Sequence, residues 1–77
     1  MVKITDVGYN EWFALPYYVR FMASDAIVEQ VWEWCSDNLT GWGLRPDKTG
    51  LETLIYTHVC FHFKTQKTRD WFILRWS

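Results

Sequence analysis

The stretch from Ser24 to Leu39, SDAIVEQVWEWCSDNL, has the hydrophobic pattern that most constrains the fold of this chain. At about 100° per residue, its aliphatic and thiol side chains fall within an arc of about 120°, and its acidic and amide side chains occupy the opposite side. The apolar set is Ile27, Val28, Val31, Cys35 and Leu39. Ser24 is a favourable N-cap, and Gly41 follows the last turn as a stop signal. The pattern predicts one amphipathic helix that packs on a sheet.

Aromatic residues are unusually abundant for so short a chain. Six Trp, four Tyr and five Phe make up 19% of the 77 residues. A chain of this length forms a single domain, here residues 1–77, near the lower limit for a self-sufficient core. Each aromatic side chain can bury roughly 150–250 Å². Two interpretations stay open: Trp fills a thin core efficiently, or several rings lie at the surface and contact a partner, as Trp and Tyr do at interfaces.

The charge balance argues against duplex nucleic acid as a partner. Eight Lys and Arg against nine Asp and Glu give a net charge of −1, and phosphate binding requires clustered cations. Cys35 and Cys60 lack C-x-x-C spacing and are too few for a disulfide framework, so we expect free thiols in a reducing compartment. No stretch approaches 18 apolar residues, and the N-terminus has no apolar signal core. These features predict a soluble intracellular protein with no membrane partner.

Strands are expected on both sides of the helix. Residues 17–23, YYVRFMA, alternate between Tyr17, Val19 and Phe21 on one face and Tyr18, Arg20 and Met22 on the other. After the helix we expect a short strand over residues 42–45, a turn over residues 46–50 and a long strand over about residues 52–64. Residues 1–16 are interpreted as an N-terminal appendage to a core of residues 17–77, although the alternation in residues 2–7 suits a short edge strand.

Alternation along the long strand separates an apolar face from a mixed one. The apolar face, predicted to meet Ile27, Val31 and Cys35 of the helix, contains Ile55, Thr57, Val59, Phe61 and Phe63. The opposite face contains Leu54, Tyr56, His58, Cys60 and His62. A two-layer fold leaves this second face uncovered, so it is a candidate surface for binding.

The C-terminal residues 65–77 allow two interpretations. They form either a hairpin loop followed by a strand, or a short helix capped by Thr65 or Thr68 and a closing strand over residues 73–76. The run FHFKTQKTRDWFILRW resembles a recurring ending of small uncharacterised proteins of tailed phages, at Phe61, Phe63, Phe72, Leu74, Arg75 and Trp76. The resemblance covers about a fifth of the chain. It implies a phage origin and a strand–helix–strand ending, and it implies no activity.

The order of the expected elements is strand, long helix, short strand, long strand, short helix or turn, and strand. This order predicts an α+β fold, a two-layer ferredoxin-like sandwich. An antiparallel sheet of three or four strands would carry the long helix on one face, with or without a short second helix. A meander of three or four strands with one packed helix is the alternative.

His58, Cys60 and His62 could in principle bind a metal or form a nucleophile. Alternate strand residues lie about 6.6 Å apart, so the outer two are about 13 Å apart and cannot share one ion. Two neighbours with a distant third ligand remain an alternative. For a Cys–His nucleophile, no orienting acid or oxyanion donor is identifiable. We therefore expect no cofactor, no metal and no enzymatic activity, and we interpret these residues as part of a half-covered sheet face.

The sequence thus predicts a small non-enzymatic interaction protein, phage-encoded and acting in the host cytoplasm on a host protein. The expected contact residues are Tyr18, Arg20, Trp34, Trp42, Tyr56, His58 and His62. One alternative is a homo-oligomer that sequesters a nucleotide-like small molecule between aromatic rings. Another is a sheet that binds single-stranded nucleic acid by stacking bases on Tyr18, Tyr56 and His58.

Overall fold

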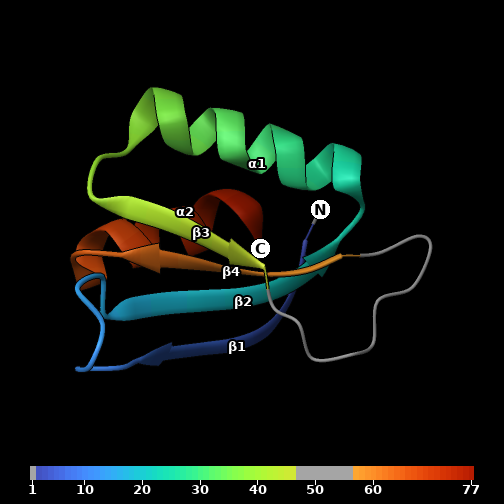
Figure 1. The fold of residues 1–77 in the computed structure, drawn as a ribbon. Coiled ribbons are helices and arrows are strands. Elements are labelled where there is room, and N and C mark those ends of the chain that lie inside the picture. The colour runs from blue at the N-terminus through green and yellow to red at the C-terminus, as the bar shows by residue number, and fades with distance from the viewer. Residues whose placement is uncertain (1, 47–56) are drawn as a thin grey trace.

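A four-stranded antiparallel sheet with two helices forms the part of the chain that the computed structural model describes, residues 2–46 and 57–77. The elements in chain order are β1 (Lys3–Tyr9), β2 (Tyr17–Ala23), α1 (Asp25–Asn38), β3 (Trp42–Pro46), β4 (Thr57–Phe63) and α2 (Gln66–Trp76). The strand order is β1-β2-β4-β3, and Figure 1 shows α1 running along the sheet. The predicted α+β class is confirmed.

Helix α1 forms where the hydrophobic pattern predicts it, with the expected cap. The backbone N–H of Ile27 donates to Oγ of Ser24 at 3.4 Å, and Asp25 lies in the first turn, at the positive end of the helix dipole. The helix ends when Leu39 becomes extended, after its N–H donates to the Cys35 carbonyl. Gly41 then takes a positive φ of 66° and turns the chain into β3.

The core lies between the helices and one face of the sheet. Val19 of β2 pairs with Phe61 of β4, and Phe21 pairs with Val59, so these side chains share a face. The same core contains Val31 and Cys35 of α1, with Ile27 packed against it. The predicted match between the helix stripe and the apolar face of β4 is therefore confirmed for the described residues. Positions 47–56, which include the predicted turn after Pro46, the start of the long strand and Tyr56, lie outside them.

The C-terminal residues 73–76 form no strand, so the predicted closing strand is wrong. Thr65 does cap a helix, because its Oγ1 accepts from the Thr68 N–H at 3.2 Å, but α2 continues to Trp76. Phe72 and Trp76 lie about one turn apart and are both buried. The Phe72 ring reaches Phe21, Phe61 and Phe63, at centroid distances of 5.1–5.9 Å. Helix α2 thus covers the same sheet face as α1.

The edge position beside β2 is occupied by β1, the first strand of the chain. It pairs antiparallel with β2, and a bulge interrupts the register between Ile4 and Asp6. The alternation in residues 2–7 therefore does mark an edge strand, and this part of the segment expected to be an appendage belongs to the sheet. Because the edge strand comes from the N-terminus, the predicted ferredoxin-like element order is not found.

Candidate functional site

The sheet face turned away from the helices gathers several of the residues that the sequence singled out. The register places Tyr18 opposite His62 and Arg20 opposite Cys60, on neighbouring strands β2 and β4. On the other side of β4, Arg45 of β3 also lies opposite Cys60. This open face of the sheet combines aromatic rings, imidazoles and two guanidinium groups.

The loop over residues 10–16 folds over one end of the open face. Its ends are joined by a 2.8 Å hydrogen bond from the Asn10 N–H to the Pro16 carbonyl. The Asn10 side chain also accepts from the Trp12 N–H at 3.0 Å, which tightens the turn. As a result, the Phe13 ring meets His62 edge-on, with 5.3 Å between ring centroids. The loop thus supplies the apolar cover that a two-layer fold lacks on this side.

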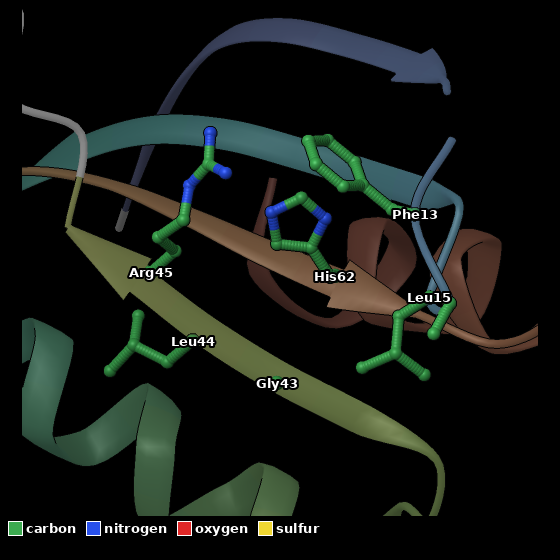
Figure 2. A pocket seen from close by; sticks show the side chains of 7 residues that line it. Phe13, Leu15, Gly43, Leu44, Arg45 and His62 are labelled. Atoms are coloured by element: carbon green, nitrogen blue, oxygen red, sulfur yellow. The ribbon is translucent and has the colours of Figure 1, made fainter. Parts of the chain in front are cut away.

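A shallow hollow of about 250 Å³ lies between this loop and β3 (Figure 2). Its lining residues are Phe13, Ala14, Leu15, Gly43, Leu44, Arg45 and His62. Gly43 has a steric role here, because a Cβ at this position would lie 3.2 Å from Cδ1 of Leu15. The hollow therefore has apolar walls, an imidazole inside and a guanidinium at its rim.

His62 is the buried polar group of this hollow. The residue is only 9% exposed, and within the described chain neither ring nitrogen has a hydrogen-bond partner. Burial lowers the pKa of His62, the charges of Arg45 and Arg20 act in the same direction, and the Leu15 backbone opposes them. The imidazole is therefore neutral at pH 7, with one N–H donor and one acceptor nitrogen.

Beside the hollow, Asp6 of β1 balances Arg20. Nη1 of Arg20 lies 3.5 Å from Oδ2 of Asp6, and the Tyr18 hydroxyl donates to the same oxygen at 3.2 Å. Burial, and then the Asp6 carboxylate, raise the pKa of Tyr18. Arg45 is placed differently: its guanidinium lies 5.2 Å from the Phe13 ring centroid, and no carboxylate of the described residues forms an ion pair with it. The positive charge of the open face is thus concentrated at the hollow.

The seven predicted contact residues do not form one surface. Tyr18, Arg20, His58 and His62 share the open face. Trp34 and Trp42 lie on the helix side: Trp34 contacts the edge of Trp71, and Trp42 stacks on Phe61 with 5.7 Å between centroids. Tyr56 is outside the described residues. The prediction thus combined residues from opposite sides of the sheet.

Three strongly exposed aromatic and aliphatic side chains were not predicted from the sequence. Trp12 in the loop is 86% exposed, and Trp71 and Leu74 on α2 are 50% and 82% exposed. Helical spacing could have identified the last two, because Phe72 and Trp76 sit one turn apart on the buried side, which turns Trp71 and Leu74 outward. Because residues 73–76 were expected to form a strand, this helical spacing was not considered.

Among residues 2–46 and 57–77, no group of three or more His, Cys, Asp or Glu side chains is placed to hold a metal ion. Neither helix in this part of the chain is long and apolar enough to span a bilayer. The chain matches no protein-family model, no curated protein and no solved structure.

Proposed function

We propose that this protein is a small non-enzymatic binding module that contacts another protein through the outer face of α2. The observation that carries the proposal is the exposure of Trp71 and Leu74, 50% and 82%, on a helix whose neighbouring aromatic residues are buried. Positions three apart on a helix lie side by side. Two large apolar groups next to each other in water are typical of contact residues, in which Trp is strongly enriched.

The Trp71 ring is held in a defined position before any partner binds. Trp34 of α1 meets it edge-on, with centroids 5.6 Å apart and an interplanar angle of 77°. A side chain that is already ordered loses less conformational entropy on binding, so more of its contact energy appears as affinity. Trp34, one of the residues predicted to make contact, would thus act by supporting Trp71.

The surroundings of these two residues resemble the rim of an interface. Gln66, Lys67 and Asp70 border an open hollow of about 600 Å³ together with Trp71 and Leu74. Polar residues around an apolar centre exclude water from the contact and fix its orientation. The partner would present an apolar side chain to this hollow. The C-terminal resemblance to tailed-phage proteins would make that partner a host protein, met in the host cytoplasm.

A capture experiment with matched variants tests the proposal. The wild-type protein, Leu74→Ser and Trp71→Ala would be immobilised and exposed to a bacterial host lysate, with Tyr9→Ser as the control. Tyr9 is 57% exposed but lies on β1, outside the hollow that Trp71 and Leu74 border. Melting temperatures would confirm that each variant is folded; Leu74→Ser serves this purpose best, because its side chain makes few contacts.

We expect the wild type and Tyr9→Ser to capture one host protein in stoichiometric amount. Both Leu74→Ser and Trp71→Ala should fail to capture it. Equal capture by all four proteins, or no capture by any, would overturn it. Sedimentation of the isolated protein distinguishes the self-associating alternative: a dimer that Leu74→Ser dissolves would show that the α2 face meets a second copy of this chain.

A further inference from the structure

We infer that the hollow on the open face is a binding site for a carboxylate attached to a small apolar or aromatic group. The inference is independent of the α2 surface and goes beyond the proposed function. It rests on three features that meet in one place: the guanidinium of Arg45, the buried imidazole of His62 and the apolar wall formed by Phe13 and Leu15 of the 10–16 loop.

Arg45 supplies the charge for the anionic end of the ligand. Its guanidinium lies over the Phe13 ring at 5.2 Å, and no carboxylate of residues 2–46 and 57–77 forms an ion pair with it. Stacking on an aromatic ring leaves the N–H edges of a guanidinium free to donate. A planar guanidinium matches a carboxylate with two parallel hydrogen bonds. The second guanidinium of this face, on Arg20, is already beside Asp6.

His62 supplies a second donor within the hollow. Buried polar atoms in folded proteins are almost always hydrogen-bonded, to protein, water or a ligand. Both ring nitrogens of His62 lack a partner within the described chain although the residue is nine-tenths buried. A neutral imidazole can donate one N–H to a carboxylate oxygen. The Leu15 backbone, which acts on the pKa of the ring, can engage at most one of its two nitrogens, so the fold leaves hydrogen-bonding capacity of His62 unused.

The walls and the volume of the hollow indicate the size and apolar character of the group attached to the carboxylate. Phe13 and Leu15 of the loop are apolar, and Gly43 of β3 leaves the floor without a side chain. The Leu44 side chain points away from the hollow, toward α1 (Figure 2). Ligand pockets usually span about 300–1,000 Å³. At about 250 Å³, this hollow has room for one ring or a short branched chain. Inorganic phosphate would leave the apolar walls unused, and a nucleotide would exceed the space.

Two sources present this chemistry, a free small acid and the C-terminal carboxylate of a peptide. The probes are therefore sodium benzoate, N-acetylphenylalanine, benzyl alcohol and inorganic phosphate, each titrated into the ¹⁵N-labelled protein. Amide and imidazole resonances report where each probe binds. We expect saturable shifts at Gly43, Arg45 and His62 with benzoate, and at least tenfold weaker binding of benzyl alcohol and phosphate.

N-acetylphenylalanine separates the two sources. Tighter binding of this probe than of benzoate would assign the site to a chain terminus, and weaker binding would assign it to a free acid. Arg45→Gln should reduce benzoate affinity at least tenfold, while Arg75→Gln, an equal charge change on exposed α2, should leave it unchanged. Gly43→Ala should also weaken binding, because its Cβ would narrow the floor against Leu15.

Three results would overturn the inference. The first is the absence of any saturable shift with either acid. The second is equal affinity for benzoate and benzyl alcohol, which would mean that the carboxylate makes no contact. The third is an unchanged affinity in folded Arg45→Gln.

Discussion

Arg69 of α2 donates a 3.0 Å hydrogen bond from Nη1 to the backbone carbonyl of Gly8 in β1, which joins the C-terminal helix to the N-terminal strand. The same guanidinium lies 5.2 Å from the Tyr17 ring centroid, and its side chain is only 12% exposed. Hydrogen bonds from charged donors contribute about 1.5–3 kcal/mol. We expect Arg69→Ala to lower the free energy of unfolding by about 2 kcal/mol.

The control for Arg69→Ala is Lys67→Ala, which removes the same charge from an exposed position of the same helix. Urea denaturation gives the two free energies, and amide hydrogen exchange gives the site of the effect. Exchange in β1 should accelerate in Arg69→Ala alone, because this contact holds the edge strand. If both variants lose equal stability, the hydrogen bond to Gly8 is not what stabilises the strand.

Val31 provides a test of the core. It is fully buried on α1 among the apolar side chains of β2 and β4. Val31→Asp would place a charge there without a partner, at a cost of about 4 kcal/mol or more, which is comparable to the whole stability of a small domain. Gln30→Asp adds the same charge at the exposed neighbouring position. Circular dichroism should show Val31→Asp unfolded and Gln30→Asp folded; an unchanged melting temperature in Val31→Asp would contradict this packing.

Acidification should weaken the fold through His62. The groups facing its ring are Tyr18 and Arg20 of β2, Arg45 of β3, and Phe13 and Leu15 of the loop. Burial lowers the pKa of His62, and both guanidinium groups add to this effect. Since an unfolded histidine takes up its proton near pH 6.5, the unfolded state binds more protons in that range. Stability should fall as the pH drops through about 6.5, and the loss should end below the folded pKa.

Urea titrations at about pH 7.5, 6.5 and 5.5 measure this loss, since they span the unfolded histidine pKa. His62→Gln removes the titrating group and should flatten the dependence between the first two values. Carboxylates contribute to the slope of both proteins at the lowest pH, so the difference between the two curves is the relevant quantity. Identical slopes would show that His62 takes up its proton equally in the folded and unfolded states.

Both cysteines should resist thiol reagents in the folded protein. Burial raises the pKa of Cys35 to about 12, and Cys60 is 2% exposed. Reaction requires an accessible thiolate, so labelling should proceed only through unfolding. Ellman's reagent should detect no fast thiol in buffer and two in urea. One thiol that reacts rapidly in buffer would reveal an accessible cysteine and reopen the nucleophile interpretation of Cys60.

Single-stranded nucleic acid should bind weakly. The net charge is −1, and phosphate contacts dominate affinity for nucleic acids. Fluorescence anisotropy with an oligothymidine of about 20 nucleotides should give a dissociation constant above about 1 μM at about 150 mM salt. Submicromolar affinity that Tyr18→Ala abolishes would show that the open face stacks bases.

The sequence predicted well those elements whose own hydrophobic pattern is enough to identify the buried face. The helix stripe from Ile27 to Leu39 and the alternation from Val59 to Phe63 each specify a buried face without knowledge of the partner. The tail was ambiguous because residues 71–76 are apolar or aromatic at nearly every position, so that periods of 2 and 3.6 fit almost equally. In the structure these residues form a helix rather than a strand: Thr65 caps it, and Phe72 and Trp76, one turn apart, are both buried.

The candidate site was only half predictable. The alternation in β4 indicated His58 and His62, and the alternation in β2 indicated Tyr18 and Arg20. Phe13 and Arg45 reach His62 only because the 10–16 loop folds over the sheet and β3 pairs beside β4. Such contacts between distant segments leave no periodic signal in the sequence. The sequence also could not show that Trp34 and Trp42 lie on the opposite side of the sheet, because their positions too depend on contacts between distant segments.

The central position of β4 has a consequence for the order in which a ribosome delivers this chain. Strands β1 and β2 emerge first and can pair at once, but the other edge of β2 gains its neighbour only when residues 57–63 appear. Until then the backbone groups along this edge of β2 have no strand partner, which is the condition that favours aggregation. Synthesis interrupted between β2 and β4 would therefore leave a hairpin with an open edge, because both β2 and β3 pair with β4, which belongs to the last 21 residues (57–77) of the 77-residue sequence.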